Sequence, residues 1–297
     1  MKRHGTIVLL APVALGVAFL ASLGSVQSFV SPDAATMATR VAPRQHGPIK
    51  VHRWRPDRQV DSENWSGYAV TGTSFTQALG SWTVPEVNCS ETPATRSTNA
   101  YASFWVGIDG YTSSTVEQIG TDSDCDYTSD GSVPIYYAWY EFYPANAYEI
   151  TGVEVSPGNQ ISAEVSYSGS EFTVEITNET TGQSFSKTES IRKAKRTSAE
   201  WIAEAPCCAR GGNFLPLSDF GTVSDGGDYT GVGGTNFATN TSKSGPIASF
   251  GPALCTQTDS SNCVSQINMV TSSGAPEDTS SSLTPDGTSF QVTWDAD

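Results

Sequence analysis

The sequence predicts an all-β protein, built as a large antiparallel β-sandwich. From about residue 61 it is rich in Ser, Thr, Gly and Tyr, with short alternating runs of apolar and polar residues between turn residues. About a dozen such runs follow one another, which is typical of sandwiches. Ser168-Gly169-Ser170 and Thr181-Gly182 give the clearest hairpin signals between them. These observations place one domain at 61–297.

The N-terminus, residues 1–28, has the pattern of a secretory signal peptide. Lys2-Arg3-His4 is a positive start, 6–23 is apolar, and Val26-Gln27-Ser28 offers small residues for cleavage. An uncleaved membrane anchor is the alternative, because the apolar run approaches spanning length. No later segment is apolar enough to span. We therefore expect an extracellular protein with no membrane contact after the signal is removed.

The next segment, 29–60, has the composition of a basic propeptide, with an approximate boundary. It carries six Lys or Arg, two acids and four prolines, whereas 61–297 carries 29 acids and eight bases, a net charge of −21. Opposite charges attract the two parts at neutral pH, and acid weakens the attraction by protonating carboxylates. We expect this propeptide to inhibit the domain; a disordered linker is the alternative.

Charge and histidine content exclude several functions. An acidic domain with few bases cannot neutralise a phosphate backbone, so we expect no nucleic-acid partner. All three histidines lie in the first 60 residues, so a mature domain has no Ser-His-Asp triad, Cys-His pair or histidine-bound zinc. Chemistry must then come from carboxyl, amide, hydroxyl or phenol groups. We expect no cofactor, no metal and a monomer.

Period-two alternation predicts the individual strands. One segment conflicts with the all-β pattern, because 189–205 favours a helix on propensity. The candidate strands are 64–70, 78–84, 101–109, 115–120, 135–143, 160–168, 171–178, 183–189, 218–224, 246–250 and 288–294.

Six cysteines in an exported chain predict disulfide bonds. Cys255 and Cys263 flank a short polar loop and are the favoured pair, and Cys89 with Cys125 is plausible. The adjacent Cys207 and Cys208 either bridge each other or pair elsewhere, and the sequence leaves this open.

Two strands carry unusual side-chain patterns. In 101–109 one face is apolar, whereas the other places Trp105 among polar residues, as in the wall of a cleft. In 135–143 aromatic residues occupy both faces, and Glu141 lies between Trp139 and Tyr143. A carboxyl in this setting indicates a substrate groove or a buried, hydrogen-bonded Glu. A glycoside hydrolase using Glu141 in an acid pair, or a non-catalytic carbohydrate-binding module, is the alternative.

An ordered set of motifs then points to one family. The stretches, in chain order, are NWSGYAV (64–70), GSWTVPEV (80–87), FWVGIDG (104–110), EQIGTD (117–122), AWYEFYP (138–144), AEWIAEAP (199–206), LSDFGTV (217–223) and SFQVTW (289–294). In this order the chain resembles the glutamic peptidases, or eqolisins, over nearly all of 61–297.

The resemblance implies a sandwich of two large, curved antiparallel sheets with a catalytic Gln and Glu on the concave face. By motif these are Gln118 and Glu200, and Glu204 is the main competitor for the second role. It also implies that 198–204 is a strand. The residues it places in or behind the cleft are Trp65, Trp105, Asp109, Asp122, Tyr137, Trp139 and Glu141.

The function implied by this resemblance is a secreted, acid-acting endopeptidase that is insensitive to pepstatin. Its substrates are proteins or peptides, which a water activated by the Gln/Glu dyad hydrolyses. The small number of Lys and Arg residues is compatible with activity in acid. With few bases, few carboxylates form ion pairs that protonation would break. We expect the melting temperature to change little from about pH 5 to about pH 3.

Overall fold

The computed structural model describes residues 38–41, 44–55, 59–92, 99–207, 214–251 and 262–296. The predicted signal peptide and the cysteines at 208 and 255 lie outside these residues. Within the described chain, no helix is long and apolar enough to cross a membrane.

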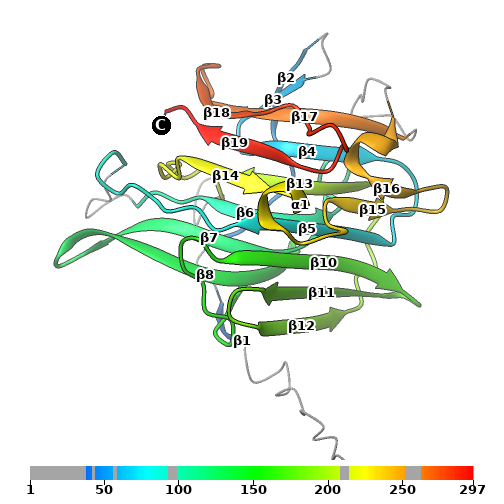
Figure 1. The fold of residues 1–297 in the computed structure, drawn as a ribbon, viewed down its shortest axis with the longest axis horizontal. Helices are drawn as coiled ribbons and strands as arrows, with labels where there is room; N and C mark the ends of the chain where they lie inside the picture. Colours follow the sequence, from blue (N-terminus) through cyan, green and yellow to red (C-terminus); the bar gives the residue numbers. More distant parts are fainter. Residues whose placement is uncertain are drawn as a thin grey trace, which may run out of the picture. The chain divides into compact units, whose positions relative to one another are not determined.

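The strands form two layers, as predicted (Figure 1). In spatial order the first layer is β12 (Gln183–Glu189), β11 (Glu171–Asn178), β10 (Gln160–Ser168), β5 (Gln77–Thr83), β14 (Thr222–Asp225), β19 (Phe290–Trp294) and β18 (Pro276–Ser280). The second is β17 (Cys263–Val270), β4 (Trp65–Thr71), β13 (Ser198–Glu204), β6 (Ser103–Ile108), β7 (Val116–Thr128), β8 (Gly131–Tyr143), β9 (Tyr148–Ile150) and β1 (Ala38–Val41).

All of these neighbours pair antiparallel, and β17 also pairs with β18, which joins the layers at one end. Short elements complete the described chain: β2 (Val51–Trp54), β3 (Gln59–Ser62), α1 (Gly227–Thr230), β15 (Phe237–Thr239), β16 (Ser244–Pro246) and η2 (Ile247–Phe250). The predicted strand at 246–250 is wrong, because Ile247–Phe250 form the 3-10 helix η2 directly after β16. The strands β17 and β18 have no counterpart in the prediction.

The main hydrophobic core lies between the layers. On β6, Phe104, Val106 and Ile108 enter this core, whereas Trp105 belongs to a second cluster on the opposite face. The two-faced pattern predicted for this strand is therefore confirmed. Gly120 on β7 faces Trp105, and a Cβ there would lie 2.3 Å from the Phe104 carbonyl oxygen. Glycine is needed for the two strands to approach this closely.

The helix-prone segment contains a central strand, in agreement with the family resemblance. β13 is hydrogen-bonded to β4 on one side and to β6 on the other, and all seven of its residues are buried. Its side chains alternate, so that Ala199, Trp201 and Ala203 enter the core between the layers. Two flanking ladders and core burial outweigh the local propensity.

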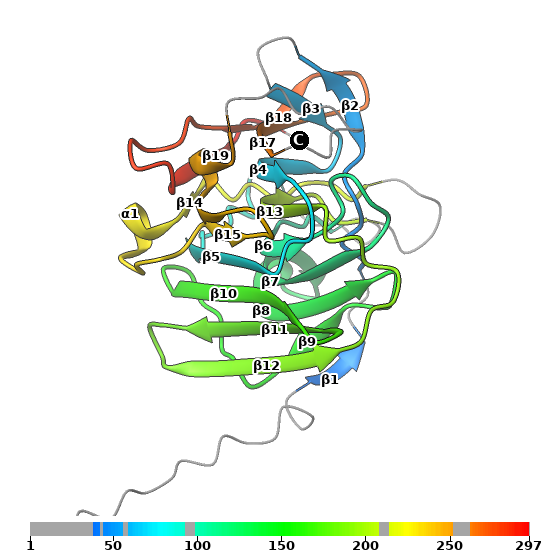
Figure 2. The same ribbon diagram turned by 90° about the vertical axis from the view of Figure 1, so that its right-hand side faces the viewer.

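The opposite face of the second layer is covered by residues 44–55, which we call the strap. The strap ends in β2, which pairs with β3, and β3 pairs parallel with β17 (Figure 2). Ile49, Val51 and Trp54 pack on the second hydrophobic cluster. The Trp54 ring meets the Tyr111 ring edge-on, with centroids 6.0 Å apart. Part of the segment predicted as propeptide is thus built into the domain.

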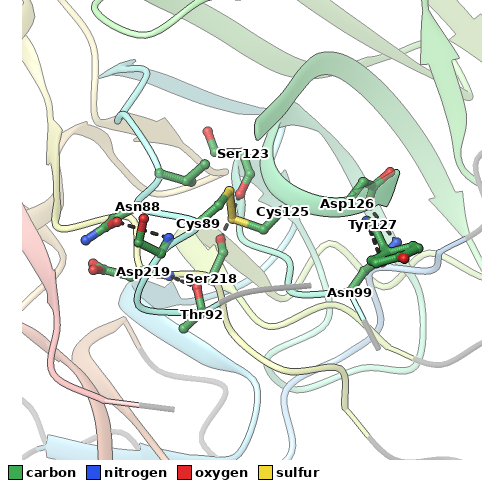
Figure 3. The surroundings of a disulfide bond; sticks show 12 residues. Asn88, Cys89, Thr92, Asn99, Ser123, Cys125, Asp126, Tyr127, Ser218 and Asp219 are labelled. Carbon is green, nitrogen blue, oxygen red and sulfur yellow. Dashed lines mark hydrogen bonds between the residues drawn. A yellow bond between two sulfur atoms is a disulfide. The ribbon is translucent and has the colours of Figure 1, made fainter. Parts of the chain in front are cut away.

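A disulfide bond joins Cys89 to Cys125, which confirms the pairing judged plausible from the sequence (Figure 3). It fixes the loop after β5 to the far half of β7. Beside it, the Ser218 hydroxyl donates to the Ser123 carbonyl at 2.8 Å. Cys207 and Cys263 are also disulfide-bonded. The expected partner of Cys263 lies outside the described residues.

Candidate active site

Five neighbouring strands bring most of the predicted site residues onto the face under the strap. The side chains on this face are Trp65 from β4, Trp105 from β6, Gln118 and Asp122 from β7, Tyr137, Trp139 and Glu141 from β8, and Glu200 and Glu204 from β13. Each strand contributes alternate residues, so the same period that builds the core also builds this face.

Asp109 is the exception, because it turns toward the loop before β13. It has φ +74° directly after β6. Its carboxylate accepts hydrogen bonds from the backbone N–H groups of Lys195 and Arg196 at 2.7 Å and of Thr197 at 3.0 Å. Asp109 therefore lies behind the site and positions the start of the strand that carries Glu200 and Glu204.

Gln118 contacts the strap directly. Its Nε2 donates a hydrogen bond to the backbone carbonyl oxygen of His46. The backbone N–H of the same His46 donates to Glu141 Oε2 at 2.7 Å, and Gln118 Nε2 lies 3.4 Å from that oxygen. The Gln118 amide and the Glu141 carboxyl thus bind the backbone carbonyl and the backbone N–H of the same residue, His46.

Glu204 lies on the other side of His46. The Trp105 Nε1–H donates to Glu204 Oε2 at 2.8 Å, and His46 Nδ1 lies 3.4 Å from the same oxygen. The His46 ring stacks on Trp139 with centroids 3.6 Å apart. Burial raises the pKa of Glu204 well above its usual range, and Glu141 raises it further. Burial lowers the pKa of His46, and Arg44 lowers it further, so its imidazole is neutral here.

Glu200 is on the same face but in different surroundings. It lies opposite Gly107 of β6, whereas Glu204 lies opposite Ser103. Burial raises the pKa of Glu200 well above its usual range, and the nearby acids Asp109 and Glu117 add to the effect. Hydrogen bonds from the Ser198 side chain and the Tyr111 backbone act against that rise. The polar contact between the strap and β13 is that of His46 with Glu204.

An acidic pocket adjoins the site and holds a buried arginine of the strap. Arg44 is 6% exposed, and its guanidinium lies 3.8 Å from Asp122, 3.0 Å from Asp124 and 3.7 Å from Asp126. It also stacks on the Tyr101 ring at 3.8 Å. Desolvation raises the pKa of Asp124 and Asp122, and the Arg44 charge acts against that rise.

Tyr137 completes this pocket, because its hydroxyl donates to Asp122 Oδ2 at 2.7 Å and contacts Arg44. The sequence interpretation included Asp122 and Tyr137 but missed Asp124 and Asp126. The signal was present: these acids alternate along β7, which places them on one face of the strand. It also missed Arg44 and His46, although all the histidines lie in the basic segment.

The comparisons with known proteins agree with this architecture. The model of the peptidase A4 family matches residues 63–264. Aspergillopepsin-2 of Aspergillus niger is 33% identical over 181 residues, which cover 55% of this chain and 62% of that protein. Scytalidopepsin B of Scytalidium lignicola is 32% identical over 219 residues, which cover 68% of this chain and 78% of that protein.

Solved structures share the fold. Scytalido-glutamic peptidase with a transition-state analogue inhibitor has a TM-score of 0.56 at 24% identity, covering 78% of this chain and 98% of that one. SCP-B, an eqolisin in complex with the tripeptide Ala-Ile-His, has a TM-score of 0.52, also at 24% identity. The family match spans more than half of the sequence and confirms the resemblance seen in the motifs, so the chain belongs to the peptidase A4 family, the glutamic peptidases.

Proposed function

We propose that the protein is a secreted, acid-acting endopeptidase in which Gln118 and Glu204 activate the water that hydrolyses the peptide bond. The observation that carries this proposal is the convergence of Gln118, Glu141 and Glu204 on one residue of an extended segment, His46. The family membership supports the reaction class.

Gln118 has the role of an oxyanion donor and water-positioning group. A neutral amide donates at any pH, so it suits work in acid, where a histidine would be charged. Its Nε2–H meets a peptide carbonyl oxygen, which is the atom that becomes negative in the tetrahedral intermediate.

Glu204 has the role of general base and then general acid. The Trp105 Nε1–H donates to one carboxyl oxygen, Oε2, and a hydrogen bond from the Trp65 side chain also stabilises the charged form of this carboxyl. This carboxylate takes a proton from the water and later returns it to the leaving nitrogen. Glu200 was the motif-based candidate for this role, and the contacts of Glu204 with the strap favour the alternative.

Glu141 has a binding role rather than that of a glycosidase acid. It accepts the backbone N–H of the residue whose carbonyl meets Gln118, so it fixes that residue in position. Trp139 supplies the flat surface on which the His46 ring stacks.

The strap is proposed to inhibit the enzyme as part of its propeptide. His46 and Arg44 fill the positions that a substrate would need, and both are buried. While the strap excludes water, desolvation keeps the pKa of Glu204 high and the carboxyl protonated. Release of the strap admits water, lowers that pKa and allows Glu204 to act as a base.

The test is a digest of a denatured protein with pepstatin present, from about pH 2 to about pH 7, with wild type and Glu204→Gln. We expect pepstatin-resistant cleavage with a maximum in acid, reduced by about 10³-fold or more in the variant. Equal cleavage by both proteins would refute the assignment. Absence of cleavage by wild type, after removal of the strap has been verified by mass, would refute the activity itself.

A further inference from the structure

We infer that the mature enzyme binds protein substrates along the edge of β9, where a substrate segment upstream of the cleaved bond adds one more strand to the second layer. This rests on the proposed function, in which β1 leaves together with the strap. The substrate class is an unfolded, extended polypeptide. It must continue for eight residues before the one that meets Gln118, because that is the separation of Ala38 from His46.

β1 lies at the end of the second layer, beside β9 (Figure 2). The two strands pair antiparallel, and the register runs from Val41 opposite Tyr148 to Ala38 opposite Ile150. When β1 leaves, the backbone N–H and C=O groups on this side of β9 lose their partners. An open strand edge of this kind is a template for pairing with another extended chain.

β1 and the strap belong to one continuous segment. β1 ends at Val41 and the strap begins at Arg44, so only two residues separate them. The strap carries the carbonyl oxygen that accepts the hydrogen bond from Gln118. The same segment therefore reaches both the catalytic amide and the edge of β9, and it marks a path that a long substrate can follow.

Backbone hydrogen bonds hold the segment along this path. Gln45 forms a pair of them with Cys207, at 2.9 and 3.2 Å, and the Ile49 N–H donates to the Gly110 carbonyl at 3.2 Å. Main-chain contacts recognise an extended backbone and accept many different side chains. Such contacts suit an endopeptidase whose substrates are unfolded proteins of varied sequence.

β9 is anchored to the domain without the help of β1. It pairs with β8, from Tyr148 opposite Tyr140 to Ile150 opposite Ala138. The rings of Tyr148 and Tyr140 stack with centroids 5.4 Å apart, and Ile150 enters the main hydrophobic core. The edge should therefore keep its position after β1 has gone.

Glu149 gives this edge a preference for a basic residue. Its ladder partner in β8 is Trp139, which lies on the catalytic face, and its ladder partner in β1 is Arg40. Opposite charges at directly paired positions stabilise a β-ladder. A substrate residue in the Arg40 position, six residues before the one that meets Gln118, should therefore bind better when it is basic than when it is acidic.

The first experiment measures kcat/KM in acid for the mature domain, from which β1 and the strap have been removed in trans. One peptide has four residues on each side of the cleaved bond, and the other carries five more residues upstream. We expect the extension to raise kcat/KM by about tenfold, mainly through a lower KM, because the added contacts are distant from the reacting bond. An extension with proline at alternate positions is the matched control and should give no gain, since proline cannot donate to a ladder.

The second experiment tests the place of binding by charge reversal. Two extended peptides carry Arg or Glu in the position of Arg40. Wild type should favour the Arg peptide by about threefold to fivefold in kcat/KM, and Glu149→Lys should favour the Glu peptide. Glu171→Lys is the matched control, because Glu171 is an exposed residue of β11 in the first layer, and it should keep the wild-type preference.

Equal kcat/KM for the short and the extended peptide would overturn the inference, as would an equal gain from the proline extension or an unchanged charge preference in Glu149→Lys. A mature domain that dimerises while the extension gives no gain would make a second copy the occupant of the edge, which also overturns it. The short peptide separates the two failures. If it is cleaved but the extension has no effect, only the inference is wrong, whereas cleavage of neither peptide would refute the proposed function.

Discussion

Gln118 is the residue that we propose carries chemistry in acid. It lies on β7 between Gly107 of β6 and Glu141 of β8, and its side chain is fully buried beneath the strap. Gly107 has no side chain, which leaves room beside Gln118. A Cβ at position 107 would lie only 2.8 Å from the Trp105 ring, so a larger residue would clash there. A neutral amide among carboxyls keeps its donor whatever the protonation state of its neighbours.

Replacement of Gln118 by Ala should therefore remove transition-state stabilisation and leave the fold intact. We expect kcat to fall by about 10²- to 10³-fold, because one oxyanion donor is lost. Steady-state kinetics on a peptide substrate in acid measures this, with far-UV circular dichroism as the control for folding. A variant with near-wild-type kcat would show that Gln118 only binds the strap.

Residue identity alone could not separate Glu200 from Glu204. They are four residues apart on one strand, so both face the site, and the motif contains both. What distinguishes them is the neighbour across the ladder: Gly107 for Glu200 and Ser103 for Glu204. The sequence motif favours Glu200, which shares its ladder neighbour Gly107 with Gln118, whereas the proposal of Glu204 rests on the position of His46.

The strap is the element whose behaviour should depend most on pH. Burial favours the neutral form of His46, so its contribution to strap binding is present above its ordinary pKa, near 6.5, and declines as the pH falls below it. The titratable groups facing it are Glu204 and Glu141, and the charged group is Arg44. Protonation of Asp122 and Asp124 in acid also weakens their attraction to Arg44.

In a Glu204→Gln background, which prevents cleavage, the strap should open as the pH falls. Amide hydrogen exchange of residues 44–55, corrected for its intrinsic pH dependence, reports this opening. A further change of His46→Phe keeps a ring to stack on Trp139 but cannot be protonated, so the opening should shift to lower pH. Identical profiles with and without His46 would exclude the imidazole as a trigger.

The substitution Arg44→Gln tests the contribution of the arginine–aspartate contacts to strap binding. It leaves Asp122, Asp124 and Asp126 without their cation, so the strap should be released at a higher pH than in the parent. Lys50→Gln is the matched control, because Lys50 is exposed and pairs with Glu63 outside this pocket. The same hydrogen-exchange measurement compares them, and an equal effect of both changes would mean that only net charge matters.

Strand prediction succeeded where alternation was strong and failed where it was not. The side chains of β10 and β11 alternate between the core and the solvent, and those of β6 alternate between the core and the site. All three strands were located from the sequence. β17 has no such regularity: it is buried at six of its eight positions, between β4, β3 and β18. Its place depends on pairing with strands distant in sequence, which local patterns do not encode.

At the scale of the whole molecule, the charge balance favours stability in acid. Burial raises the pKa of Asp278 to about 8 and that of Glu117 to about 9. These carboxyls are protonated in the folded protein, so their stabilising contribution is complete below their ordinary pKa near 4 and is lost as the pH rises through 8 to 9. Because these carboxyls are already protonated at pH 5, lowering the pH to about 3 does not change their charge in the folded protein. This is compatible with the predicted small change in melting temperature over that range.

The melting temperature of the Glu204→Gln precursor should accordingly fall as the pH rises from about 5 to about 8. Asp278→Asn keeps the acceptor for the Met269 N–H and cannot ionise, so this variant should lose less stability over that range. Calorimetry at several pH values measures both proteins. A melting temperature that rises toward pH 8 would contradict the account of buried, protonated carboxyls.

In the proposed mechanism, Gln118 works with Glu204 and not with Glu200. The most direct measurement is kcat for Glu204→Gln and Glu200→Gln on the same peptide in acid, each purified with the strap already removed in trans. We expect a loss of about 10³-fold or more for Glu204→Gln and a change of at most about tenfold for Glu200→Gln. The reverse order would restore Glu200 as the catalytic base and contradict the assignment built on His46.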